Sequence, residues 1–163
     1  MTTVSPAQAG ETRLTPISNL LAQQMTENNC KQAFLDSKKR LEKMRGVQVV
    51  RAETRKHGYA NFPSGRSQEY FIVIANNQLG ENVMNSPVLL TSIASTITSA
   101  CSAIGFVNFA INQTDWVRGY GVVGNRVTAF KCLDLDIRNR EQTYIDGQGN
   151  IYQEVSWGYQ RYL

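Results

Sequence analysis

The sequence contains one histidine, His57, and three widely spaced cysteines, Cys30, Cys101 and Cys132. Structural zinc sites usually recruit several Cys or His ligands, often in close pairs, and this chain has no C-x-x-C motif. We therefore predict no metal site and no cofactor. A catalytic Cys–His pair would require one cysteine to meet His57 in space, which the spacing does not favour. His57 is expected to be a polar loop residue.

A small, odd set of cysteines is also not the pattern of a disulfide framework. We expect three reduced and mostly buried thiols. The alternative is a single Cys101–Cys132 bridge, formed in an oxidising compartment. Residues 1–11 have neither the basic start nor the apolar core of a signal peptide. These features predict a cytoplasmic protein, with a processed exported protein as the alternative.

Charge is absent from residues 82–114. Within this stretch, residues 87–104 could be mistaken for a membrane-spanning helix. However, seven of these 18 residues are Ser or Thr, whereas a span needs about 20 predominantly apolar residues. We therefore predict no membrane span.

The same residues, 87–104, are bounded by the start and stop signals of a helix in a globular protein. Ser86 and Pro87 are a start signal, and Gly105 follows the last apolar position. One face is apolar, while the opposite face carries hydroxyl groups where a fully solvated face would more often carry charge. Small uncharged side chains let another surface approach closely, so we predict a contact surface, within the fold or between subunits. Its residues are Thr91, Ser92, Ser95, Ser99 and Ser102.

Positive charge is concentrated in residues 31–66, which hold ten of the seventeen Lys and Arg residues but only three acids, a net charge of 10 − 3 = +7. The part from Lys38 to Arg45 is expected to end a helix, where cations complement the negative end of the macrodipole. Asp36 and Glu42 lie four residues from Arg40 and Lys38 respectively, so ion pairs are expected there.

The second part of the basic region is a basic–aromatic hairpin over residues 51–66. Its cations alternate with aromatic residues and glycine on a strand and the following loop. Such a surface can neutralise phosphates and stack bases, can bind an acidic protein partner, or can be merely solvated. The candidate binding residues are Arg51, Arg55, Lys56, His57, Tyr59, Phe62 and Arg66.

Gly119, Gly121 and Gly124 form the pattern G-x-G-x-x-G. In a dinucleotide-binding fold this pattern ends a strand and opens a helix whose amides hold pyrophosphate. Here residues 126–136 follow and have the pattern of a strand. A protein-kinase glycine loop does lie in a hairpin, but only 32 residues follow Lys131 and they lack the other kinase motifs. We interpret the glycines as relieving crowding in a bent or bulged hairpin.

Four acids, Asp134, Asp136, Glu141 and Asp146, cluster near the end of the chain. Asp134 and Asp136 share one face of the expected strand, where paired carboxylates can hold a divalent cation or transfer protons. Arginines lie close by in sequence, and strand ends often carry solvated charge. We therefore interpret these acids as solvated, and no catalytic residue is predicted.

Hydrophobic periodicity and turn residues predict an α+β fold: an antiparallel sheet of about five to six strands with two main helices packed on one face. Residues 1–14 are expected to be a flexible leader and residues 15–163 a single domain. The expected elements are one helix over about 16–45, or two in series if Asn28-Asn29 interrupts it; strands over 47–56 and 68–75; the helix over 87–104; and strands over 107–111, 116–123, 126–136, 143–145 and 151–157.

The leading functional hypothesis is a non-enzymatic binding or assembly module that self-associates or binds a protein partner. It depends on the hydroxylic helix face and on the lack of a catalytic constellation. One alternative is a nucleic-acid-binding protein that uses the basic–aromatic hairpin. Another is a small enzyme or ligand-binding domain with a pocket between the sheet and the helices.

Overall fold

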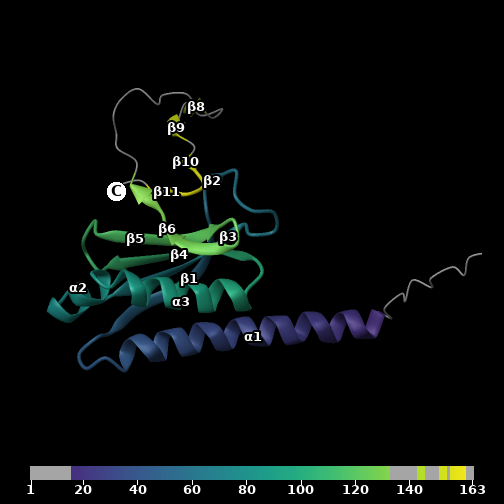
Figure 1. Ribbon diagram of the computed structural model, residues 1–163, viewed down its shortest axis with the longest axis horizontal. Helices are drawn as coiled ribbons and strands as arrows, with labels where there is room; N and C mark the ends of the chain where they lie inside the picture. Colours follow the sequence, from purple (N-terminus) through teal and green to yellow (C-terminus); the bar gives the residue numbers. More distant parts are fainter. Residues whose placement is uncertain (1–15, 133–142, 146–150, 154, 161–163) are drawn as a thin grey trace, which may run out of the picture.

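The computed structural model describes residues 16–132, 143–145, 151–153 and 155–160, with the elements labelled in Figure 1. The predicted leader and the acids Asp134, Asp136, Glu141 and Asp146 lie outside these residues. The helices are α1 (Pro16–Glu42), α2 (Gln78–Met84) and α3 (Pro87–Ala100). The strands are β1 (Val49–Lys56), β2 (Tyr59–Ala60), β3 (Gln68–Ile74), β4 (Ile104–Ile111), β5 (Val117–Val123), β6 (Arg126–Ala129), β7 (Lys131–Cys132), β8 (Thr143–Ile145), β9 (Ile151–Gln153), β10 (Val155–Ser156) and β11 (Tyr159–Gln160).

The main sheet has five strands in the order β1-β3-β4-β5-β6, and the predicted α+β class is confirmed. Every neighbouring pair is antiparallel except β3 and β4, which are parallel. The parallel pair follows from the chain path, because the connection between β3 and β4 runs through α2 and α3, and parallel neighbours need such a crossover.

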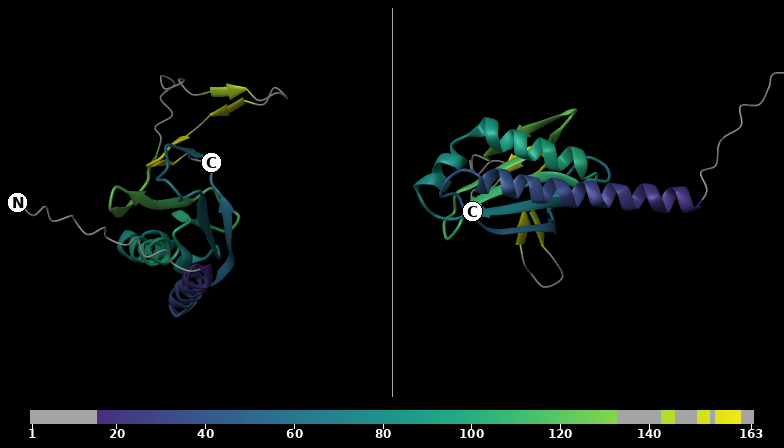
Figure 2. Two further views of the ribbon diagram at one scale, coloured as in Figure 1. Left: turned by 90° about the vertical axis from the view of Figure 1, so that its right-hand side faces the viewer. Right: turned by 90° about the horizontal axis from the view of Figure 1, so that it is seen from below.

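Helices α1 and α3 cover one face of this sheet, which we call the helix-covered face (Figures 1 and 2). Alternate residues of β3 and β4 point into the layer between sheet and helices. The resulting core between the sheet and the two helices is large and mostly aliphatic. Its buried side chains include Leu41, Ile72, Ile74, Leu90, Ile93, Ile97, Phe109 and Ile111.

Helices α1 and α3 run antiparallel and are joined at both ends of their contact. A disulfide links Cys30 to Cys101, with Cα atoms 4.7 Å apart, and Arg40 Nη1 donates a hydrogen bond to Ser92 Oγ at 2.8 Å. The expectation of three reduced thiols is therefore wrong, and the alternative Cys101–Cys132 bridge is not formed. The sequence predicted that these thiols are buried, but it could not show that the two helices bring Cys30 and Cys101 together.

The long helix α1 is continuous through Asn28 and Asn29, but only its second half is packed. All residues from 21 to 29 are exposed, and burial begins near Cys30. Figure 1 shows the first half extending beyond α3 and the sheet. Of the two predicted ion pairs, Lys38 and Glu42 are 3.9 Å apart. Asp36 instead accepts a hydrogen bond from Gln32, since Arg40 is bound to Ser92.

The short helix α2 was not predicted, although its start has a recognisable signal. Asn77 Oδ1 accepts hydrogen bonds from the backbone N–H groups of Leu79, at 3.1 Å, and Gly80, at 2.8 Å. Asparagine is a favoured N-cap residue because its side chain satisfies these otherwise free donors. The cap directs the chain from the end of β3 back across the sheet towards α3.

The opposite face of the sheet, which we call the open face, is covered in part by C-terminal residues. The strands β5 and β6, and likewise β8 and β9, form antiparallel hairpins. The expected strand 151–157 is instead two short strands, since β10 leaves β9 and pairs in parallel with β2. The last strand, β11, pairs in parallel with β7. These two short ladders hold residues 155–160 above one end of the open face.

Candidate functional site

Charged side chains of the hairpin strand β1 lie on the open face of the sheet. Arg51, Glu53 and Arg55 alternate along β1, so their side chains share this face. The guanidinium carbons of Arg51 and Arg55 lie 5.4 and 3.8 Å from the ring centroid of Phe71 in β3. Cations over an aromatic face are attracted by the ring quadrupole. The two arginines therefore cover a small apolar cluster that includes Phe71 and Val73.

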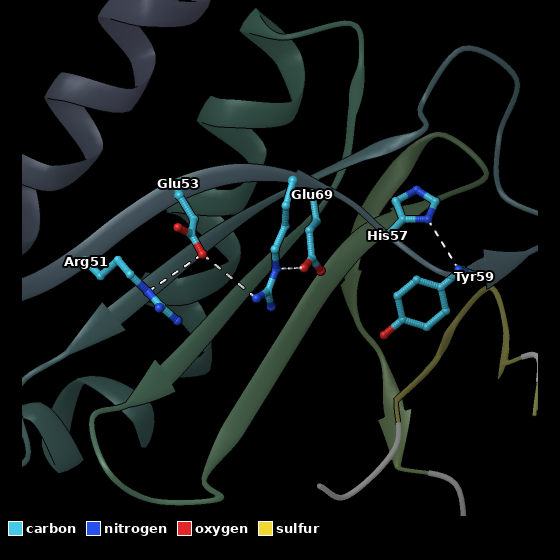
Figure 3. Close-up of polar contacts among 6 residues, drawn as sticks. Arg51, Glu53, His57, Tyr59 and Glu69 are labelled. Atoms are coloured by element: carbon cyan, nitrogen blue, oxygen red, sulfur yellow. Dashed lines mark hydrogen bonds and ion pairs between the residues drawn. The ribbon is translucent and has the colours of Figure 1, made fainter. Parts of the chain in front are cut away.

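Both arginines are also paired with glutamates (Figure 3). Glu53 Oε1 lies 3.7 Å from Arg51 Nε and 3.9 Å from Arg55 Nη1, and Arg55 Nε donates a hydrogen bond to Glu69 Oε1. Glu69 is only 6% exposed and lies directly opposite Arg55 in the β1–β3 register. Much of the local positive charge is thus neutralised, which reduces the attraction for phosphates, and nucleic-acid binding stays a prediction.

The histidine of the hairpin is held by hydrogen bonds and by aromatic rings. His57 Nε2 donates to the backbone oxygen of Arg66 at 2.7 Å, and Nδ1 accepts from the backbone N–H of Tyr59 at 3.4 Å. This pattern fits the neutral tautomer with the proton on Nε2. The ring lies 4.8 Å from Phe62 and 5.1 Å from Trp157 between centroids. With both nitrogens engaged, His57 fixes the loop and is not poised as a general base.

The side chain of Arg66 is bound to the end of α3 and not to the hairpin strand. Its Nη1 donates to the backbone oxygens of Thr98, at 3.0 Å, and Ile104, at 2.6 Å. Carbonyls at a helix C-terminus attract cations, so this bond secures the loop to the end of α3. Trp157 also joins the aromatic cluster around His57. It was not among the predicted binding residues, because nothing in the sequence brings residues 157 and 57 together.

The glycines of the G-x-G-x-x-G pattern make room for aromatic rings. A Cβ atom on Gly119 would lie 2.3 Å from the Phe106 ring, and one on Gly121 would lie 2.4 Å from the Phe130 ring. Gly124 occupies the turn between β5 and β6 with φ of 60°. The crowding interpretation is confirmed for Gly119 and Gly121, whereas a Cβ atom on Gly124 would meet no atom within 4 Å. The β5–β6 pairing has no register shift and hence no bulge.

A polar pocket of about 460 Å³ opens on this face, between the Arg55–Glu69 pair and residues 155–160. Gln160 Oε1 closes one wall by accepting a hydrogen bond from the Gly119 N–H at 2.7 Å. Asn108 Oδ1 is buried at the pocket, and none of the described groups donates to it. The residues that give the pocket its polarity are Arg55, Lys56, His57, Glu69, Asn108 and Gln160.

A second hollow lies on the other side of the molecule, beside the first half of α1. It is a groove of about 660 Å³ between α1, the edge of β1 and β3, and the end of α3. The disulfide forms part of its floor, and its walls combine small, apolar and polar side chains. Residues that line it include Thr26, Glu27, Lys31, Phe34, Ser102 and Ile104.

The predicted contact surface on α3 is used partly within the fold. Ser92 accepts the hydrogen bond from Arg40 of α1, and Thr91, Ser92 and Ser95 are half-buried. Ser99 and Ser102 are exposed. The hydroxylic face therefore has a covered part and an exposed part, and the exposed part reaches the groove at Ser102.

No three His, Cys, Asp or Glu side chains within the described ranges gather as metal ligands would. None of the helices seen in the structure combines the length and apolarity that a bilayer crossing demands. Comparisons of the chain with protein families, with curated proteins and with solved structures gave no match.

Proposed function

We propose that this protein is a non-enzymatic binding and assembly module that self-associates through the first half of α1. The observation that carries the proposal is the exposure of every residue from 21 to 29 on a helix that extends past its own domain (Figure 1). The proposed partner is a second copy of the chain.

The exposed half of α1 lacks the features that stabilise an isolated helix. Helical segments of this length are marginal in water without tertiary packing. The first turn of α1 has no acidic residue to complement the macrodipole, and Glu27 is the only charged residue from 16 to 30. A covering surface would supply the missing stabilisation.

The exposed half also presents apolar side chains. Leu21 and Met25 are 56% and 66% exposed, and they share one helix face because they are four residues apart. Single exposed apolar residues are ordinary. This pair is notable because the groove of about 660 Å³ begins on the same stretch of helix, so one copy carries both a helix to be covered and a groove that can receive one.

Such a surface is self-complementary, which is what a twofold dimer requires. In an antiparallel arrangement of two α1 helices, each groove would receive the exposed half of the other copy, as in helix-in-groove recognition. The scarcity of charge removes repulsion between copies. Glu27 and Lys31 both line the groove and could pair reciprocally. The Cys30–Cys101 disulfide fixes the direction of the helix at the point where burial begins.

Sedimentation velocity across a wide concentration range tests the proposal. We expect a reversible dimer, and we expect the Leu21→Glu/Met25→Glu variant to weaken it by about tenfold or more, because charge would be buried in the interface. Val88→Glu is the matched control, since Val88 is 81% exposed on the first turn of α3. A wild-type protein that stays monomeric, or a double variant that dimerises as Val88→Glu does, would refute self-association through α1.

A further inference from the structure

We infer that the two copies of the proposed dimer are also joined through their sheets. The outer edge of β1 pairs with the same edge of the second copy, in antiparallel orientation, so that the two main sheets become one. This inference rests on the proposed self-association and adds to it the strand that the copies share. It specifies one register, with Thr54 on the twofold axis.

Strand β1 has a long edge that no other strand covers. It is the outermost strand of the main sheet, beside β3 (Figure 2). β1 has eight residues, whereas the strand at the opposite edge, β6, has four. No described strand or loop outside the sheet is hydrogen-bonded to the outer edge of β1. Long exposed edges pair readily with other strands, and proteins usually shorten or cover them.

The backbone groups on this edge can be identified from the neighbouring strand. The N–H of Gln68, which lies opposite Lys56 in the β1–β3 register, donates to Ala103 on the far side of β3 at 3.0 Å. Lys56 and Gln68 are therefore not a hydrogen-bonded pair, and the backbone groups of Lys56 point to the outer edge. Because this direction alternates along a strand, Ala52 and Thr54 also present theirs. These are the groups that an added strand binds.

The charges along β1 do not repel a second copy. On the open face the strand carries Arg51, Glu53 and Arg55, which form ion pairs with one another, and Glu69 of β3 pairs with Arg55. The positive and negative charges in this row cancel. A row of like charges is one of the devices that protect an exposed edge, and the open face of β1 does not have it.

Charge and strand geometry select one register. A twofold antiparallel pairing places one residue opposite its own copy on the axis. A charged residue on the axis, such as Glu53 or Arg55, would lie directly opposite a like charge, which is destabilising. Ala52 on the axis would bring the register shift after Val49 into the new ladder. With Thr54 on the axis, each Glu53 lies opposite Arg55 of the second copy, and the two threonines face each other.

This register is continuous with the proposed helix contact. Thr54 lines the groove of about 660 Å³ beside α1, together with Glu27 and Lys31. A twofold axis perpendicular to the sheet keeps both α1 helices on the same side of the joined sheet and reverses the direction of one of them. An axis at Thr54 therefore brings the second α1 to the groove in antiparallel orientation. The strand pairing and the helix contact are then two layers of one interface.

Disulfide cross-linking tests the register. Thr54→Cys and, as the control, Lys56→Cys are each combined with Cys132→Ser, so that the introduced cysteine is the only one outside the Cys30–Cys101 bridge. In the inferred register the Cα atoms of the two residues 54 lie about 5.5 Å apart, which suits a disulfide, whereas those of residues 56 are separated by about 14 Å along the strands. Under mild oxidation of the dimer, Thr54→Cys should cross-link at least about tenfold faster than Lys56→Cys. Equal rates would overturn the inference.

A proline at the same position separates a failure of this inference from a failure of the proposed function. Thr54→Pro removes an N–H that points to the outer edge and leaves the bonds between β1 and β3 in place, and proline is tolerated on edge strands. It should weaken the dimer about tenfold or more relative to Thr54→Ala, which keeps the N–H. Sedimentation velocity measures both variants, and circular dichroism checks that both are folded. If the wild type dimerises and Thr54→Pro dimerises as well as Thr54→Ala, the edge pairing is wrong and the α1 contact stands. A wild type that stays monomeric overturns both.

Discussion

The two faces of the central sheet are built differently. The helix-covered face is a continuous aliphatic core between β-strands and two helices, in which large side chains such as Ile72 and Phe109 are fully buried. The open face has only a small apolar cluster around Phe71, shielded by arginine side chains, and an aromatic cluster beneath Trp157.

This difference predicts which substitutions will change the stability of the fold most. Apolar burial on the helix-covered face supplies most of the free energy of folding. The open face keeps charged groups, an unpaired acceptor and a pocket, and these features add little to the stability of the fold. We therefore expect substitutions on the helix-covered face to change stability most.

The largest contrast should come from two phenylalanines on opposite faces. Phe109→Ala should lower the free energy of unfolding by about 3–5 kcal/mol, because a fully buried ring leaves a cavity among rigid neighbours. Phe71→Ala should cost about 2 kcal/mol, since Arg55 lies on one side of the ring and can settle into the space. Urea unfolding with unchanged m-values measures both. Equal losses would contradict the difference between the faces.

The disulfide on the helix-covered side should give the next largest effect. Cys30 and Cys101 are 71 residues apart, and closing a loop of that length stabilises a fold by about 2–4 kcal/mol. The Cys30→Ser/Cys101→Ser variant should lose this amount, and dithiothreitol should lower the stability of the wild type equally. In Cys132→Ser the response to dithiothreitol should persist; its disappearance would mean that a different pair is bridged.

The tight packing of the open face around Gly119 can be tested by adding a methyl group there and, as a control, at Gly58. Gly119→Ala should destabilise by about 2–3 kcal/mol, because the new methyl group would collide with Phe106 and with Gln160. Gly58→Ala is the matched control, since no heavy atom lies within 4 Å of its Cβ position. That change should be neutral or slightly stabilising. If Gly119→Ala were as harmless as Gly58→Ala, the aromatic cluster would not be tightly packed against β5.

The arginines of the open face should differ from each other. Arg55→Met should cost about 1–2 kcal/mol, because Glu69 would keep a buried carboxylate without its partner. Arg51→Met removes an exposed ion pair with Glu53 and a distant cation–ring contact with Phe71, and it should cost less than about 1 kcal/mol. In the Arg55→Met/Glu69→Met variant most of the loss should be recovered. A loss in the double variant equal to that of Arg55→Met would show that the pair is not coupled.

Sequence periodicity predicted the helix-covered face well and the open face poorly. The helices α1 and α3 could be predicted because helical spacing is a local property of the sequence. The two strands on either side of Gly124-Asn125 could be predicted for the same reason. The Arg55–Glu69 pair was missed because the counter-charge comes from the neighbouring strand.

Long-range contacts account for the other misses. Trp157 joins His57 through two-residue parallel ladders that have no periodic signal. The Cys30–Cys101 bond depends on how two helices dock, and the parallel β3–β4 pair depends on a crossover. Of the candidate binding residues, Arg55, Lys56, His57 and Tyr59 line the pocket on the open face, but Asn108 and Gln160, which also line it, were not anticipated.

The smallest expected effect is an alkaline loss of stability that belongs to the helix-covered face. Burial raises the pKa of Tyr70 above its ordinary value of 10.0. Burial also raises the pKa of Tyr120, with Arg118 acting in the opposite direction. Below about pH 10 both phenols are protonated in the folded and the unfolded chain, so they cause no pH dependence.

Above about pH 10 the unfolded chain releases these protons first, because its tyrosine pKa values are lower than those of the folded chain. The free energy of unfolding should therefore fall as the pH rises, until the folded-state phenols ionise as well. Tyr70→Phe should make this fall shallower, whereas Tyr159→Phe, at an exposed position on β11, should leave it unchanged. Urea unfolding at several pH values measures how steeply the free energy of unfolding falls with pH. If Tyr70→Phe shows the same fall as the wild type, the phenol of Tyr70 is as accessible to water in the folded protein as in the unfolded chain.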